Sequence, residues 1–78
     1  MVQLTLYTRY GCHLCEDMIE HLQALQKEHA FELELRDVDG DAQWFQLYNE
    51  LVPLLEYDGE ELCRYFLDQQ KLLTVINT

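Results

Sequence analysis

The sequence predicts one small α/β domain over residues 1–78, with helices covering a mixed four-stranded sheet. Three observations predict it. Hydrophobic periodicity gives the order strand, helix, strand, helix, strand, strand, helix. A Cys-x-x-Cys pair, Cys12 and Cys15, stands where the first strand meets the first helix, and Asp58-Gly59 marks a tight hairpin. Strands joined by a helical crossover are parallel, so we expect a parallel first pair and an antiparallel last pair.

The first strand and the first helix flank the cysteine pair. Residues 2–7 alternate apolar and polar side chains, and Gly11 permits the turn that follows. The helix is expected from about residue 12 or 13 to about residue 28. Its apolar stripe has the three- and four-residue spacing of a buried helix face and consists of Leu14, Cys15, Met18, Ile19, Leu22 and Leu25. Because Cys15 belongs to this stripe, we expect it to face inward and Cys12 to be exposed at the N-terminal end of the helix.

The middle of the chain predicts an edge strand and a second helix. Residues 31–38 alternate leucines with charged side chains, which suits an edge strand. Asp41 follows a turn and can cap the helix. The helix carries apolar side chains at positions i, i+3, i+4 and i+7, namely Trp44, Leu47, Tyr48 and Leu51. Trp44 and Phe45 cannot both face inward, so one of them is expected at the surface.

The C-terminal part predicts a hairpin and a last helix. Pro53 is the only proline, and it opens a strand over residues 54–57. After the Asp58-Gly59 turn, the return strand is expected over about residues 61–65. Asp68 can cap a final helix whose packing residues are Leu72, Leu73, Val75 and Ile76.

The cysteine spacing indicates thiol–disulfide chemistry. Helix N-termini carry free N–H groups and partial positive charge, which favour the thiolate form of cysteine. Cys12 is therefore the expected nucleophile, with a pKa below the free value of about 8.5, and Cys15 is the buried resolving thiol. Two inert core cysteines, or half of a metal site, are the alternatives.

Other side chains near the pair have open roles. His13 can favour the Cys12 thiolate and relay protons, or can simply face solvent. Tyr10 is a better candidate than Tyr7 to line the site, because Tyr7 can be the last residue of the first strand. Cys63 can be a second redox thiol or a glutathionylation site, although a strand cysteine packed as a small hydrophobe is the favoured interpretation.

Composition limits the partners and the compartment. A net charge of −10 argues against nucleic acid or an anionic membrane as a partner and favours partner proteins that have a basic docking face. Acidic surfaces more often only aid solubility. Three cysteines are an odd number, which disfavours a structural disulfide framework. No signal peptide and no apolar run of about 20 residues is visible. We therefore expect a cytoplasmic monomer.

These residues resemble those of the thioredoxin superfamily and, within it, the small glutaredoxin-like proteins. The resemblance covers essentially the whole chain and rests on three features, Cys12-His13-Leu14-Cys15, Val52-Pro53 and the hairpin followed by a helix. It implies a sheet ordered second, first, third, fourth strand, with a cis Pro53 facing the cysteines. It makes Val52 and Pro53 substrate-site residues. Arg9 falls where many glutaredoxins keep a lysine near the thiolate and the glutathione carboxylate.

The chain departs from the family pattern at three places. Cys-His-Leu-Cys replaces Cys-Pro-Tyr-Cys, and Leu6 stands where thioredoxins carry a buried acid. The glycine pair and acidic residue with which glutaredoxins bind glutathione are absent, and the bulky residues 62–65 occupy that region. We therefore expect weak, unselective glutathione binding, with a protein dithiol of the thioredoxin-reductase type as an equally plausible reductant.

The expected function is a thiol–disulfide oxidoreductase that reduces protein or small-molecule disulfides. No resident cofactor is expected, and glutathione would be a co-substrate. One alternative is a module that binds zinc or an iron–sulfur cluster through Cys12 and Cys15 at a dimer interface, with His13 as a further ligand. Zinc usually takes four ligands, and the sequence has no second cysteine pair to complete them, so we expect no metal ligands. A domain without turnover that acts through protein contacts is the other alternative.

Overall fold

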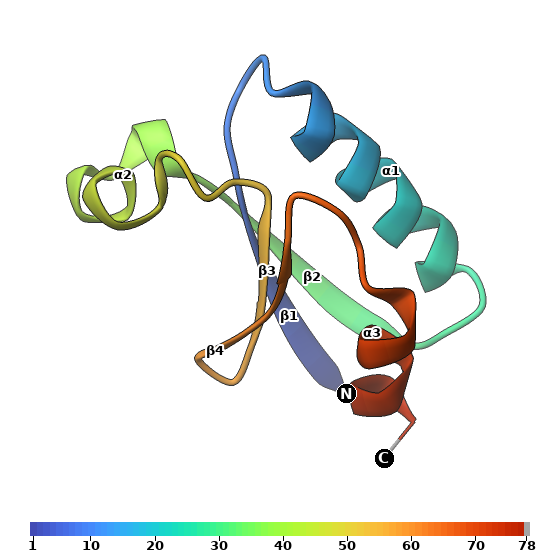
Figure 1. Ribbon diagram of the computed structural model, residues 1–78. Coiled ribbons are helices and arrows are strands. Elements are labelled where there is room, and N and C mark those ends of the chain that lie inside the picture. The colour runs from blue at the N-terminus through green and yellow to red at the C-terminus, as the bar shows by residue number, and fades with distance from the viewer. Residues whose placement is uncertain (78) are drawn as a thin grey trace.

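The computed structural model describes residues 1–77 and has the predicted order of elements (Figure 1). The elements are β1 (Val2–Thr8), α1 (His13–Gln26), β2 (Phe31–Asp37), a 3₁₀ turn η1 (Val38–Gly40), α2 (Ala42–Tyr48), β3 (Leu54–Tyr57), β4 (Glu60–Arg64) and α3 (Gln69–Ile76). The predicted bounds of the four strands and of α1 differ from these by no more than about two residues, which is the usual uncertainty of such ends.

The four strands form one mixed sheet in the order β2-β1-β3-β4. β1 runs parallel to β2, whereas β3 is antiparallel to both β1 and β4. This is the arrangement that the resemblance to thioredoxins implies, and the predicted α/β class is confirmed. β2 is an edge strand, as its alternation of leucine and charge predicted.

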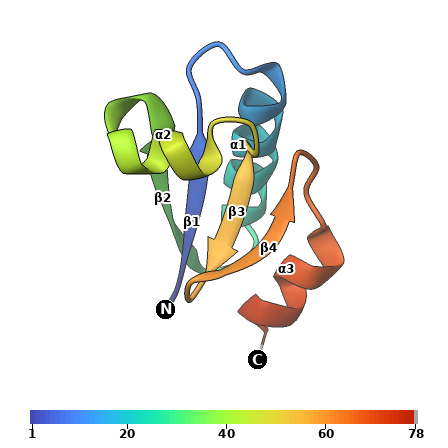
Figure 2. The same cartoon turned by 60° about the vertical axis from the view of Figure 1, so that its left-hand side comes forward.

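The sheet separates two hydrophobic clusters. α1 and α3 cover one face, and α2 lies over one end of the other face (Figures 1 and 2). The larger cluster contains the buried residues Leu4, Leu6, Met18, Leu22, Leu25, Phe31, Leu55, Leu62 and Leu72. Tyr7 belongs to the smaller cluster with Val38 and Leu54, because successive side chains of a strand point to opposite faces.

The apolar stripe of α1 is confirmed, whereas that of α2 is only partly buried. Cys15, Met18, Leu22 and Leu25 are buried. In α2 the side chain of Leu47 is 55% exposed and that of Phe45 is 41% exposed. The helix has only two turns and rests on the small Tyr7 cluster, which reaches Trp44 and Tyr48 but leaves Leu47 in water. In α3 only Leu72 is buried.

The predicted caps and turn are present. Asp41 Oδ1 accepts hydrogen bonds from the N–H groups of Gln43 and Trp44 at 2.9 and 3.1 Å. Asp68 caps α3 in the same way through Lys71 N–H. Asp58 and Gly59 have positive φ values of 52° and 81°, as a two-residue hairpin turn requires.

Within residues 1–77, no helix has the length and apolar character needed to cross a bilayer.

Candidate active site

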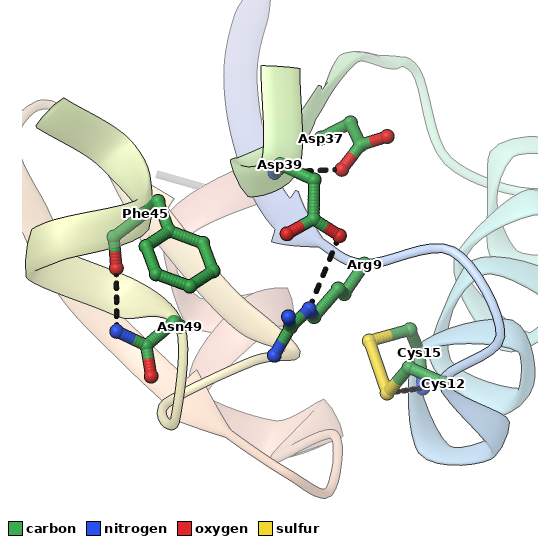
Figure 3. A network of polar contacts seen from close by, with 7 residues as sticks. All are labelled: Arg9, Cys12, Cys15, Asp37, Asp39, Phe45 and Asn49. Atoms are coloured by element: carbon green, nitrogen blue, oxygen red, sulfur yellow. Dashed lines mark hydrogen bonds and ion pairs between the residues drawn. A yellow bond between two sulfur atoms is a disulfide. The ribbon is translucent and has the colours of Figure 1, made fainter. Parts of the chain in front are cut away.

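The cysteine pair lies at the start of α1 and forms a disulfide (Figure 3). Cys12 is the N-cap residue, and its Cα atom is 5.2 Å from that of Cys15, within the range that a disulfide spans. Cys15 is fully buried, while Cys12 is half-buried. A partner molecule can therefore reach Cys12 and cannot reach Cys15.

Local hydrogen bonds prepare Cys12 for negative charge. The Cys15 N–H donates to Cys12 Sγ at 3.2 Å, and the sulfur lies at the positive end of the helix dipole. Gly11, with φ of 77°, turns the chain here, and Cys12 N–H donates to the Arg9 carbonyl at 3.2 Å. In the reduced protein, the Cys15 N–H and the N-terminus of α1 would stabilise a thiolate on Cys12, and the carboxylate of Glu16 in the first turn would oppose it.

Val52 and Pro53 are the second pair of predicted site residues. The bond between them is cis, as the resemblance implies. Pro53 is fully buried, and Val52 packs half-buried against the Tyr7 cluster. The next residue, Leu54, pairs with Tyr7 near the end of β1, which leads into the cysteine loop. The sheet thus brings residues about 40 positions apart in sequence to the same end of the molecule.

Arg9 is held by two groups that sequence reasoning did not find. Its Nε donates to Asp39 Oδ2 at 3.1 Å, and its guanidinium lies 5.2 Å from the centre of the Phe45 ring. Asp39 N–H in turn donates to Asp37 Oδ1 at 2.9 Å. Figure 3 shows the Arg9 side chain extending between Phe45 and the disulfide. The cation beside the cysteines is therefore already paired with a carboxylate.

Tyr10 and His13 lie at the surface, whereas Tyr7 does not. Tyr10 is 95% exposed and borders a shallow cleft of about 240 Å³ next to Arg9. The His13 side chain is 88% exposed, with Nε2 3.9 Å from Asp17 Oδ2. Tyr7 is buried and stacks on Tyr48 with ring centres 4.1 Å apart. Tyr7 is therefore a packing residue, while Tyr10 and His13 can meet a partner.

Cys63 has the environment of a packing residue. It is half-buried on β4 against the larger cluster, and burial raises the pKa of its thiol. A raised pKa keeps the sulfur protonated and less nucleophilic.

Across residues 1–77, no three His, Cys, Asp or Glu side chains come close enough together to hold a metal ion.

Comparisons with known proteins show the family and the fold of this chain. The family model described as the glutaredoxin-like domain (DUF836) matches residues 3–77. An NMR structure of a Nitrosomonas europaea protein is 44% identical with a TM-score of 0.84, over 96% of this chain and 91% of that one. A crystal structure of an X. campestris protein is 33% identical with a TM-score of 0.70, over 95% of each chain.

One more distant likeness concerns the fold alone. The structure of a malarial protein is 19% identical to this chain and has a TM-score of 0.68, over 99% of this chain and 94% of that one. A search of curated proteins finds no match.

Proposed function

From the premise that this chain belongs to the family of glutaredoxin-like domains, we propose that it is a thiol–disulfide oxidoreductase acting on protein or small-molecule disulfides. The observation that carries the proposal is the Cys12–Cys15 disulfide at the start of α1, with one accessible and one buried sulfur. In this proposal the protein works as a monomer in the reducing cytoplasm. It needs no resident cofactor, because the two sulfurs themselves carry the electron pair.

The reaction begins from the reduced pair. The Cys12 thiolate attacks one sulfur of the substrate disulfide, and the other substrate sulfur leaves as a thiolate that takes up a proton. Cys15 then loses its proton and attacks Cys12 Sγ in the mixed disulfide. The second substrate thiol departs with a proton, and the Cys12–Cys15 disulfide remains. Two electrons have passed from the dithiol to the substrate.

The surroundings of the site support a protein dithiol as the reductant rather than selective use of glutathione. Glutathione carries two carboxylates. Arg9 is available to one of them only in competition with Asp39. Tyr65 and Phe66 occupy the segment after β4 where the glutaredoxins that this chain resembles bind the other carboxylate, and Arg64 is paired with Glu61. A flexible arginine also controls geometry less well than fixed backbone N–H groups.

A redox titration tests the proposed function. After equilibration in graded redox buffers, the Cys12–Cys15 pair should show a reduction potential between about −180 and −270 mV, the range of reference members of the superfamily. Reduction of a model disulfide should be followed with a glutathione system and with a thioredoxin-reductase system in parallel. The proposal is wrong if both cysteines stay reduced across this range while circular dichroism shows a folded protein.

We predict that Asp39→Asn speeds the reaction of the oxidised protein with glutathione. The substitution frees the Arg9 guanidinium for a carboxylate of the incoming thiol. Arg9 and Asp39 are each about two-fifths exposed, so the gain is that of a surface ion pair, up to about fivefold at low salt. Stopped-flow measurement of the rate at low and high salt checks it.

Asp58→Asn is the matched control. It makes the same change in net charge at the β3–β4 turn, at the opposite end of β3 from the cysteine loop (Figure 1). Asparagine also tolerates the positive φ of this position. Equal rates for Asp39→Asn and Asp58→Asn would show that the Arg9–Asp39 pair does not control the reaction with anionic thiols.

A further inference from the structure

A small groove opens between the first half of α1 and the segment that joins β4 to α3. It encloses about 130 Å³. Its apolar lining residues are Leu14, Met18, Phe66 and Leu67. Leu14 lies in the first turn of α1, which Cys12 caps, so the groove opens at the same end of the helix as the cysteine pair. A substrate residue adjacent to the attacked sulfur can therefore place its side chain there.

The turn at residues 65–66 places a large aromatic ring at this groove in spite of two costs. Phe66 is 71% exposed, which leaves an apolar ring in water. Tyr65 has a positive φ of 69°, a left-handed conformation that is strained in a residue other than glycine. The turn is fixed because Tyr65 N–H donates to the Pro53 carbonyl at 2.7 Å and its hydroxyl donates to the Glu50 carbonyl at 2.9 Å. Together with the apolar lining of the groove, this fixed ring forms an apolar surface with polar side chains at its rim, as ligand-binding grooves have.

The charges around the groove indicate which sign of charge a partner should carry. Asp17 and His21 are its charged or titratable lining residues, and the Asp17 side chain is 62% exposed. The Asp17 carboxylate supplies the negative charge of the groove. The chain has 15 acidic and 5 basic side chains. Its three arginines are ion-paired, Arg9 with Asp39, Arg36 with Glu34 and Arg64 with Glu61. A cationic segment therefore fits this surface.

We propose that this groove docks the polypeptide substrate and selects disulfides of basic proteins whose cysteine is followed by a large apolar residue and then by lysine or arginine. The apolar side chain packs on Phe66 and Leu14, and the cation lies against Asp17. This proposal rests on the proposed function and names its substrate class. The exchange step itself is unchanged, since Cys12 still attacks the substrate sulfur.

Three peptides test the docking. Each contains one cysteine in a mixed disulfide with 2-mercaptoethanol, followed by Leu-Lys, by Leu-Glu or by Gly-Lys. Reduction by the wild-type dithiol is timed at pH 8 and low salt. We expect the Leu-Lys peptide to react faster than Leu-Glu, by up to about fivefold, because its lysine attracts the exposed Asp17 carboxylate and a glutamate repels it. We expect it to react about tenfold faster than Gly-Lys, from partial burial of the leucine.

Two variants assign the preferences to residues. Asp17→Lys should reverse the order of Leu-Lys and Leu-Glu, and Glu28→Lys, the same change beyond the far end of α1, should keep it. Phe66→Ser should remove most of the preference for leucine over glycine. Leu47→Ser, which also changes an exposed apolar side chain but on α2, should keep that preference.

The result separates the docking from the chemistry. Equal rates for the three peptides, with normal reduction of the neutral bis(2-hydroxyethyl) disulfide, overturn the docking proposal and leave the oxidoreductase in place. If no disulfide is reduced, the oxidoreductase fails, and NMR shifts caused by the serine versions of the peptides decide the docking. Shifts centred on residues 14–21 and 65–67 with the Leu-Lys peptide support it. Shifts elsewhere, or self-association through these residues without peptide, overturn it.

Discussion

We expect disulfide reduction to be lost completely when Cys12 is replaced by serine, and we expect Cys15→Ser to trap substrate as a stable mixed disulfide. The half-buried Cys12 receives the Cys15 N–H hydrogen bond and is the only sulfur of the pair that a substrate can reach. A serine hydroxyl at position 12 stays protonated at neutral pH and cannot attack a disulfide. Without Cys15, the thiol that would release the adduct on Cys12 is missing.

Intact-protein mass spectrometry after exposure to a model disulfide measures both outcomes. Cys15→Ser should gain the mass of one substrate half, and Cys12→Ser should gain none. Cys63→Ser is the control and should keep wild-type turnover, because burial raises the pKa of this thiol. An adduct on Cys15 in the Cys12→Ser variant would reverse the two roles.

We also expect Leu22→Ala to remove a large part of the free energy of unfolding. Leu22 is fully buried where α1 packs on the sheet. A buried Leu→Ala substitution costs about 2–5 kcal/mol through lost apolar contact and the cavity that remains. A domain of this length has only about 4–12 kcal/mol in total, from about 0.05–0.15 kcal/mol per residue. Urea denaturation followed by circular dichroism measures the loss.

Leu47→Ala is the matched control for Leu22→Ala. It makes the same change on the exposed side of α2, so the free energy of unfolding should change by no more than about 0.5 kcal/mol. A loss similar to that of Leu22→Ala would mean that α2 buries Leu47 in solution. The two leucines both occupy periodic apolar positions, so only their packing distinguishes them.

The local features of this protein could be predicted from the sequence because their causes are local. Asp41 and Asp68 cap helices through N–H groups two or three residues away. Asp58-Gly59 forms its turn from the backbone preferences of two adjacent residues. The disulfide spans one helical turn between Cys12 and Cys15. The order of the strands in the sheet came from the family resemblance, since no local pattern specifies it.

The tertiary structure alone decided which distant groups meet around the cysteines. Asp39 pairs with Arg9 across 30 positions of the chain, and the turn that contains it carries no sign of this partner. Tyr7 and Tyr10 are close in sequence, yet one is buried under α2 and the other lies in water. Phe66 borders the groove because a hydrogen bond to Pro53 fixes the preceding residue. Such contacts depend on how the layers pack, and periodicity within one segment cannot report the distance to another.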